Sequence, residues 1–174
     1  MIQYFEAFLF IFIPLFAWLL VSYNLLIREK IRMDTSNNEL RSSIETKIKL
    51  TETFIKYTKQ HLPGNKEMCV QLEEISDKIN VAADIFELVI DTNLLEESIN
   101  NCFKQIEQDE NTACMQEFID IRHLLIDIDA RIRQNIMQYD LAAKYLNTRL
   151  GTFPANLFAK FFRIKPELRI SKSP

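Results

Sequence analysis

The sequence predicts an all-α protein in which an apolar N-terminal helix, long enough to cross a membrane, precedes a water-soluble helical domain. The first observation is an apolar stretch of 21 residues at positions 7–27, whose first 15 residues have no charged or strongly polar side chain. The second is the small number of helix breakers, two glycines and five prolines in 174 residues. The third is the recurrence of apolar residues at steps of three and four along the rest of the chain, the period of an amphipathic helix.

The apolar stretch predicts a transmembrane anchor within residues 1–27. A helix of 21 residues spans roughly 30 Å, about the thickness of the hydrocarbon layer of a bilayer. A buried core helix and a cleaved signal peptide are the alternatives. The stretch is too apolar on every face for the first, and it lacks the basic flank and small-residue cleavage site of the second. The anchor residues that we single out are Ala7, Phe8, Leu9, Trp18, Leu20 and Tyr23.

The charges on either side of the anchor predict its orientation. Residues 1–6 have no Lys or Arg, whereas Arg28, Lys30 and Arg32 follow the stretch directly. The positive-inside rule then places the N-terminus outside and residues 28–174 in the cytoplasm. The three irregularly spaced cysteines agree, since an odd number suits reduced thiols in a cytosolic domain.

Residues 28–153 are predicted to form a bundle of four helices, at about 28–61, 66–90, 94–108 and 113–150. The first continues from the anchor without a break, because no helix stop occurs before Leu62-Pro63-Gly64-Asn65. The second and third are separated at Asp91-Thr92-Asn93, where the apolar seam changes register. A single bent helix is the alternative there. Asp109-Glu110-Asn111-Thr112 is the next predicted loop, and Gly151 is the predicted C-cap glycine of the last helix.

Residues 154–174 are predicted to form a short Phe-rich amphipathic helix, over about 155–164, and a loose basic tail after Pro166. An apolar face flanked by cations suits the surface of an anionic membrane. Docking of this face onto the end of the bundle is the alternative. The candidate contacts with lipid or with a partner are Phe158, Lys160, Phe161, Phe162, Arg163 and Lys165.

The sequence predicts no catalytic, cofactor-binding or metal site. His61 and His123 are the two histidines, and Asp120-x-x-His123 only approximates the Glu-x-x-His unit of a di-iron bundle. The cysteines form no C-x-x-C pair, and no Gly-rich phosphate loop occurs. All 21 Lys and Arg follow Ile27 together with 23 of the 24 acids, so this part has a formal charge of −2. That balance argues against nucleic acid as a partner.

The chain resembles the LemA family of bacterial membrane-anchored helical proteins. The residues at matching spacing are Phe118, Asp129, Arg131-Ile132, Tyr139-Asp140, Ala142, Asn147-Thr148, Phe153-Pro154-Ala155-Asn156-Leu157, Phe162 and Lys165-Pro166. Nearer the N-terminus, Tyr23-Asn24, Leu50-Thr51-Glu52-Thr53 and Tyr57-Thr58-Lys59 also match, and residues 66–110 match only as helix. The chain departs from the family in the first soluble helix, where Ile48-Lys49 stands at the place of Pro-Asn, and at Leu146, where the family has an aromatic residue.

The resemblance implies an antiparallel, up-and-down four-helix bundle on a single-pass anchor in the bacterial inner membrane. It supplies no catalytic residues. Two of its residues have a physical interpretation: Pro154 ends the last long helix, and Asn156 caps the short helix that follows.

We therefore expect a non-enzymatic, membrane-anchored helical bundle that binds or organises another protein at the cytoplasmic face. The expected partners are the lipid bilayer and a protein that the sequence does not identify. We expect no cofactor. The sequence is compatible with homo-oligomers. Two alternatives remain. One is lipid-surface binding or membrane remodelling through the C-terminal segment, and the other is a secreted effector that inserts in a host membrane.

Overall fold

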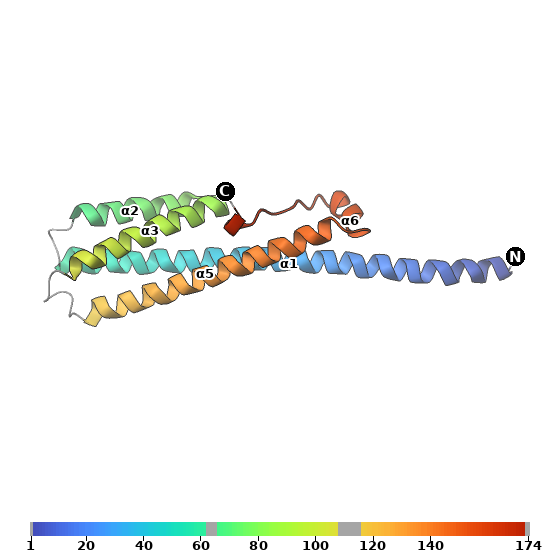
Figure 1. Cartoon of the computed structure of the whole chain (residues 1–174), viewed down its shortest axis with the longest axis horizontal. Coiled ribbons are helices and arrows are strands. Elements are labelled where there is room, and N and C mark those ends of the chain that lie inside the picture. Colours follow the sequence, from blue (N-terminus) through green and yellow to red (C-terminus); the bar gives the residue numbers. More distant parts are fainter. Residues whose placement is uncertain (1, 62–65, 108–115, 173–174) are drawn as a thin grey trace. The chain divides into compact units, whose positions relative to one another are not determined.

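The described part of the chain is all-α, as the sequence predicts. The computed structural model describes residues 2–61, 66–107 and 116–172, with side chains from Phe12 onward. Its elements, in chain order, are α1 (Ile2–His61), α2 (Lys66–Val81), α3 (Ile85–Ile106), α5 (Gln116–Leu150), α6 (Ala155–Phe161) and the short 3-10 helix η2 (Ile170–Lys172) (Figure 1). No residue within these described ranges forms a strand.

Helix α1 is a single helix of 60 residues, so the apolar segment and the first soluble helix are continuous, as predicted. Among the described residues, α1 is the one helix that is long and apolar enough to cross a membrane. Between Phe12 and Val21, every side chain except that of Leu19 is exposed. The rest of the protein begins to cover the helix shortly after this stretch, and Leu26 is fully buried.

The chain folds into two compact units. Unit 1 consists of Met1–Ser36 and Met137–Pro174, and unit 2 consists of Asn37–Ile136. Helices α1 and α5 contribute a segment to each unit. Helices α2 and α3 lie wholly in unit 2, whereas α6 and η2 lie wholly in unit 1.

Unit 2 has an apolar core to which all four of its helical segments contribute. Within this core, the ring centroid of Phe54 lies 4.7 Å from that of Phe103 and 6.2 Å from that of Phe118. Full burial of one such side chain contributes about 1.5–3 kcal/mol, so this ring cluster ties α1 to α3 and α5. Other core residues are Leu40, Ile44, Ile48 and Ile55 of α1, Leu72 and Ile79 of α2, Leu88, Leu95 and Ile99 of α3, and Ile121, Leu125, Ile128 and Ile132 of α5.

Helices α2 and α3 separate at residues 82–84, and the predicted break at Asp91–Asn93 is wrong. Asp84 is the N-cap of α3, where its carboxylate accepts a hydrogen bond of 3.2 Å from the backbone N–H of Phe86. Arg41 of α1 donates a hydrogen bond of 2.7 Å to the carbonyl of Ala83, which fixes the connection against α1.

The apolar seam of α3 does not change register at Asp91–Asn93, because Thr92 belongs to it. Thr92 is buried, and its hydroxyl donates a hydrogen bond of 2.6 Å to the carbonyl of Leu88 one turn earlier, so it needs no partner outside the helix. With Thr92 included, the buried residues of α3 follow one another at steps of three and four: Ile85, Leu88, Thr92, Leu95, Ile99, Cys102 and Ile106. The predicted helices at 66–90 and 94–108 therefore become Lys66–Val81 and Ile85–Ile106. The predicted loop Asp109–Thr112 lies outside the described residues.

The continuity of α3 through Asn93 predicts opposite effects for two substitutions at this exposed position. Asn93→Pro removes a backbone donor inside the helix and should lower the free energy of unfolding by roughly 3 kcal/mol. Asn93→Ala is the matched control and should leave it unchanged or slightly raised, because alanine is the better helix former. Urea unfolding of the full chain in detergent, followed by far-UV circular dichroism, measures both. A proline variant as stable as the alanine variant would contradict a continuous α3.

Candidate functional site

Ring contacts in unit 1 hold α6 against the end of the apolar part of α1. The ring centroid of Tyr23 lies 5.5 Å from that of Phe158 and 5.6 Å from that of Phe162. One turn and a half earlier on α1, the Trp18 ring lies 5.5 Å from the ring of Phe153, just before α6. Tilted and edge-on ring pairs at these separations are favourable arrangements for aromatic side chains. The predicted anchor residue Tyr23 thus meets the predicted Phe-rich segment, and Trp18 meets Phe153 directly before it.

The sequence also singled out four other anchor residues, Ala7, Phe8, Leu9 and Leu20. Leu20 is 47 % exposed. Ala7, Phe8 and Leu9 lie in α1, but their side chains are outside the described ones.

Helix α6 has one docked face and one exposed face. Ala155 and Ala159 are buried, and Phe158 is half-buried against Tyr23. On the exposed side, Phe161 leaves 80 % of its surface uncovered. The remaining exposed apolar residues around α6 are Phe153, Leu157 and Phe162. Exposed aromatic and aliphatic side chains gathered in this way are typical of a surface that meets lipid or another protein.

The cations of this segment are also exposed. Lys160 lies on α6, and Arg163 and Lys165 follow it. None of the three forms an ion pair with a described residue. The segment therefore presents apolar side chains and positive charges without an ion-pair partner among the described residues.

The C-terminus of α6 is closed by a Schellman motif. The N–H of Ile164 donates to the carbonyl of Ala159 at 2.9 Å, and the N–H of Arg163 donates to the carbonyl of Lys160 at 3.4 Å. Arg163 occupies the left-handed position of the motif, with φ of 55°, where glycine is the usual residue. The helix ends at Phe161, three residues before the predicted end at Ile164.

Side chains of α5 hold the segment after α6, so the predicted loose tail is wrong for residues 167–172. Asn147 makes two hydrogen bonds with the backbone of Glu167: its amide donates to the carbonyl at 2.6 Å and its oxygen accepts from the N–H at 2.9 Å. The carboxylate of Asp140 accepts from the N–H groups of Ile170 and Ser171, at 2.7 and 3.1 Å. We call residues 164–172 the C-terminal strap.

Two smaller expectations for this region are also wrong. Asn156 does not cap α6: the cap residue is Pro154, no side chain bonds to the cap, and the Asn156 side-chain oxygen has no hydrogen-bond partner among the described residues. Gly151 is not a left-handed C-cap glycine, because its φ is not positive and an added Cβ would meet only ordinary contacts, at 3.6 and 3.9 Å.

A buried charge cluster in unit 2 was missed by the sequence reasoning. Lys47 of α1 is fully buried, with its Nζ atom 2.6 Å from Asp129 Oδ1 of α5 and 3.8 Å from Glu96 Oε2 of α3. The same ammonium lies 3.4 Å from the carbonyl oxygen of Thr92, and Arg133 pairs with Glu96 at 3.4 Å. Burial raises the pKa of the Asp129 carboxyl above its ordinary value, against the opposing effect of Lys47.

The spacing of Lys47 in the sequence carries one signal for this cluster. Lys47 lies three residues after Ile44 and four before Thr51, both on the apolar face of α1. Asp129 follows core residue Ile128 directly and is among the residues of the LemA resemblance. A buried lysine needs a carboxylate within reach, which makes the pair predictable once that face is known to be buried.

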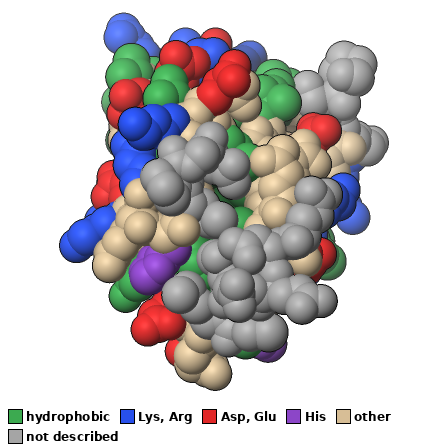
Figure 2. Space-filling model, turned by 90° about the vertical axis from the view of Figure 1, so that its left-hand side faces the viewer, with side chains coloured by type: hydrophobic (Ala, Val, Ile, Leu, Met, Phe, Trp, Pro, Cys, Tyr) green, Lys and Arg blue, Asp and Glu red, His purple; other side chains and the backbone are tan. Residues whose placement is uncertain are grey.

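The remaining titratable groups of the described residues form no recognisable chemical site. Among the described residues, no group of three or more His, Cys, Asp and Glu could hold a metal ion. His61 stacks on Tyr57 and His123 is exposed on α5. Cys69 is buried, and this burial raises the pKa of its thiol; Cys114 lies outside the described residues. The face seen in Figure 2 carries basic and acidic side chains intermixed, without a patch of one sign.

The described structure defines an all-α protein with one helix that is long and apolar enough to span a membrane. A family comparison is more specific. The model of the LemA family matches residues 36–171, which is most of the chain, and the chain therefore belongs to the LemA family. The match includes Lys47, Asp129, Asp140, Asn147 and Arg163, and it starts beyond the apolar part of α1. A comparison with curated proteins finds no match.

The charge cluster predicts that substitutions of Lys47 and Asp129 have non-additive effects on the free energy of unfolding. Lys47→Met leaves the Asp129 carboxylate buried without its partner, and Asp129→Leu leaves the buried ammonium with only its longer carboxylate contact, 3.8 Å, to Glu96. Each should lower the free energy of unfolding by about 3–5 kcal/mol, whereas the double variant should recover most of that loss. Urea unfolding of the full chain in detergent measures the cycle. Additive losses would contradict a coupled pair.

The stability loss of the Lys47→Met variant is predicted to depend on pH. A folded-state pKa above the unfolded one means that protonation of Asp129 favours the folded state. Removal of Lys47, which lowers the pKa of Asp129, raises that pKa further in the variant. The difference in free energy of unfolding between wild type and Lys47→Met should therefore shrink as the pH is lowered from neutral towards the ordinary aspartate pKa of about 3.9. A difference that is constant over this range would show that Asp129 is not the charge left uncompensated.

Proposed function

We propose that the protein is a non-enzymatic, single-pass scaffold of the bacterial inner membrane, attached to the bilayer by α1 and again by α6. The observation that carries this proposal is a set of three ring contacts, from Trp18 to Phe153 and from Tyr23 to Phe158 and Phe162. If residues of α1 up to Val21 lie in hydrocarbon, whatever packs on Trp18 and Tyr23 lies beside the bilayer too. The exposed face of α6, including Phe161, then meets the acyl chains at the membrane interface.

The burial along α1 supports this placement. Exposed apolar side chains extend to Val21, and protein covers the helix at Leu26. Fifteen residues from Ala7 to Val21 span about 22 Å, less than the roughly 30 Å of the hydrocarbon layer. Helix α6 supplies the missing apolar surface at the cytoplasmic side. Charge supports the orientation, because the basic residues Arg28 and Lys30 follow the stretch and none precedes it.

The proposal includes the arrangement of the soluble part. The segments of α1, α2, α3 and α5 in unit 2 form an antiparallel four-helix bundle within the soluble domain of residues 28–153. The anchor in residues 1–27 precedes this domain, and the membrane-contacting segment in residues 154–174 follows it. The bundle faces the cytoplasm and serves as a platform for another protein.

Trp18 is the one tryptophan of the chain and tests the membrane placement without any substitution. In vesicles that contain the full-length protein, lipids brominated along their acyl chains should quench its fluorescence strongly. Iodide in the water phase should quench it weakly, because the side chain lies in hydrocarbon. Free tryptophan amide in the same buffer is the control for iodide. Strong iodide quenching with no effect of bromolipids would contradict the proposed anchor.

A stripe of exposed apolar residues on α5 favours the protein-binding part of the proposal. Met137, Leu141 and Tyr145 recur at steps of four, and are 66 %, 39 % and 46 % exposed. A helix face of this kind, open in the folded protein, suits a protein partner. In this interpretation the membrane anchor concentrates the partner at the bilayer.

A photo-crosslinking residue placed at Leu141 tests this stripe in the native cell. It should give a discrete crosslinked product whose partner is identified by mass spectrometry. The same residue at Asp127, exposed on α5 nearly three turns before the stripe begins at Met137, is the matched control and should not give that product. Equal products from both positions, or none from Leu141, would contradict partner binding by this face.

A further inference from the structure

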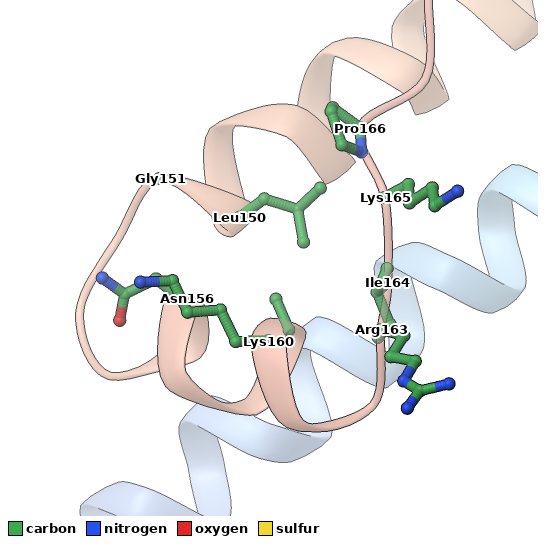
Figure 3. A pocket seen from close by; sticks show the side chains of 9 residues that line it. Leu150, Gly151, Asn156, Lys160, Arg163, Ile164, Lys165 and Pro166 are labelled. Atoms are coloured by element: carbon green, nitrogen blue, oxygen red, sulfur yellow. The ribbon is translucent and has the colours of Figure 1, made fainter.

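A cavity of about 550 Å³ lies in unit 1 where the end of α5, α6 and the start of the C-terminal strap meet. Figure 3 shows Leu150 pointing into this space from α5. The side chain of Lys160 extends from α6 to one side of the cavity, whereas those of Arg163, just before the strap, and Lys165, within it, extend to the opposite side. Ala159 and Ile164 add to the apolar lining. The cavity is therefore apolar inside and carries three cations at its edge.

The composition of the lining restricts the chemistry of an occupant. No carboxylate lines the cavity, and the three cations have no ion pair among the described residues. The two positive charges of Arg163 and Lys165, on one side of apolar walls, suit a ligand with a phosphate at one end and hydrocarbon at the other. A free phosphate would use the charges and leave the apolar walls without a contact.

The backbone at Arg163 gives a second, independent indication. Its φ of 55° is a conformation that residues with a side chain rarely adopt, and glycine would relieve it. An arginine at this place is thus unfavourable for the turn, and such strain is often found where a side chain has a functional role. The left-handed turn reverses the chain after α6, which brings both Arg163 and Lys165 to the cavity.

We propose that this cavity binds the headgroup of an anionic phospholipid of the cytoplasmic leaflet. Arg163 and Lys165 neutralise the phosphate, while Leu150 and Ile164 contact the glycerol and the first acyl carbons. The proposal rests on the proposed membrane contact of α6, since Tyr23 holds the helix that forms the cavity beside the anchor. The binding makes anionic lipid a ligand of the protein rather than only its solvent.

Energy transfer from Trp18 tests the site in the full-length protein. The protein is placed in phosphatidylcholine vesicles that contain a trace of either dansyl-labelled phosphatidylglycerol or dansyl-labelled phosphatidylcholine, both labelled on an acyl chain. The wild type should transfer more energy to the labelled phosphatidylglycerol. Arg163→Gly should lower the excess of the anionic lipid near Trp18 by about fivefold, the expected effect of one cation at a membrane surface.

Three comparisons separate binding from folding. Arg163→Gly relieves the left-handed turn, so its thermal unfolding should be unchanged or shifted upward, and lost binding cannot come from lost structure. Arg163→Lys should keep most of the lipid preference because it keeps the charge. Lys144→Gln removes an exposed cation of α5 that does not line the cavity and should keep all of it.

The possible results distinguish a failure of the proposed membrane placement from a failure of the proposed lipid site. No transfer to either labelled lipid would contradict the membrane placement of Trp18. Equal transfer to both lipids, or a preference that survives Arg163→Gly, would contradict the lipid site alone. Soluble glycerol phosphate should leave the preference unchanged when compared with chloride at the same ionic strength. Displacement by glycerol phosphate would assign the cavity to a free phosphate and overturn the lipid proposal.

Discussion

The apolar surface of α1 between Phe12 and Val21 is the constraint on which unit 1 depends. Burial of apolar surface is worth about 25 cal/mol per Å², so a row of side chains such as Phe16, Trp18 and Leu20, each more than 40 % exposed, needs a cover. Within unit 1, Phe153 covers Trp18 near the end of the row, and Phe158 of α6 covers Tyr23 just beyond it. The proposed bilayer covers the rest, and the depth of α6 in it follows from those ring contacts.

The strap explains why a helix as short as α6 keeps this position. Seven residues form too short a helix to be stable alone. It is fixed at one end by ring contacts to α1 and at the other by the strap, which Asn147 and Asp140 bind through backbone groups. Because these hydrogen bonds use the backbone of the strap, they leave its side chains, including Lys165, available for other contacts.

Unit 2 depends on a different interaction, the buried contact of Lys47 with Asp129. Such a pair adds little net stability over apolar residues of the same size, but it excludes arrangements in which either charge is buried alone. It therefore selects one alignment of α1 against α5, and Glu96 extends the selection to α3. Ring packing between Phe54, Phe103 and Phe118 stabilises the same three helices without this selectivity.

The sequence was sufficient for features that depend on the period and length of apolar runs. The all-α class, the continuity of α1 and the end of α5 at Leu150 follow from such patterns. It was insufficient where a polar residue is buried or where a side chain binds distant backbone. Thr92 satisfies its hydroxyl inside its own helix, so its burial left no mark in the pattern. The strap is held by Asn147, 20 residues earlier in the chain than its partner, and nothing in the tail itself indicates that contact.

The depth of Phe161 in the bilayer tests the central claim most directly. The double substitution Trp18→Phe and Phe161→Trp keeps an aromatic ring against Phe153 and makes position 161 the one tryptophan of the chain. In vesicles, bromolipids with the bromine near the glycerol end should quench this tryptophan strongly, and those with bromine at the chain end should quench it weakly. Strong quenching by iodide from the water phase, with no response to either bromolipid, would contradict the attachment of α6 to the membrane.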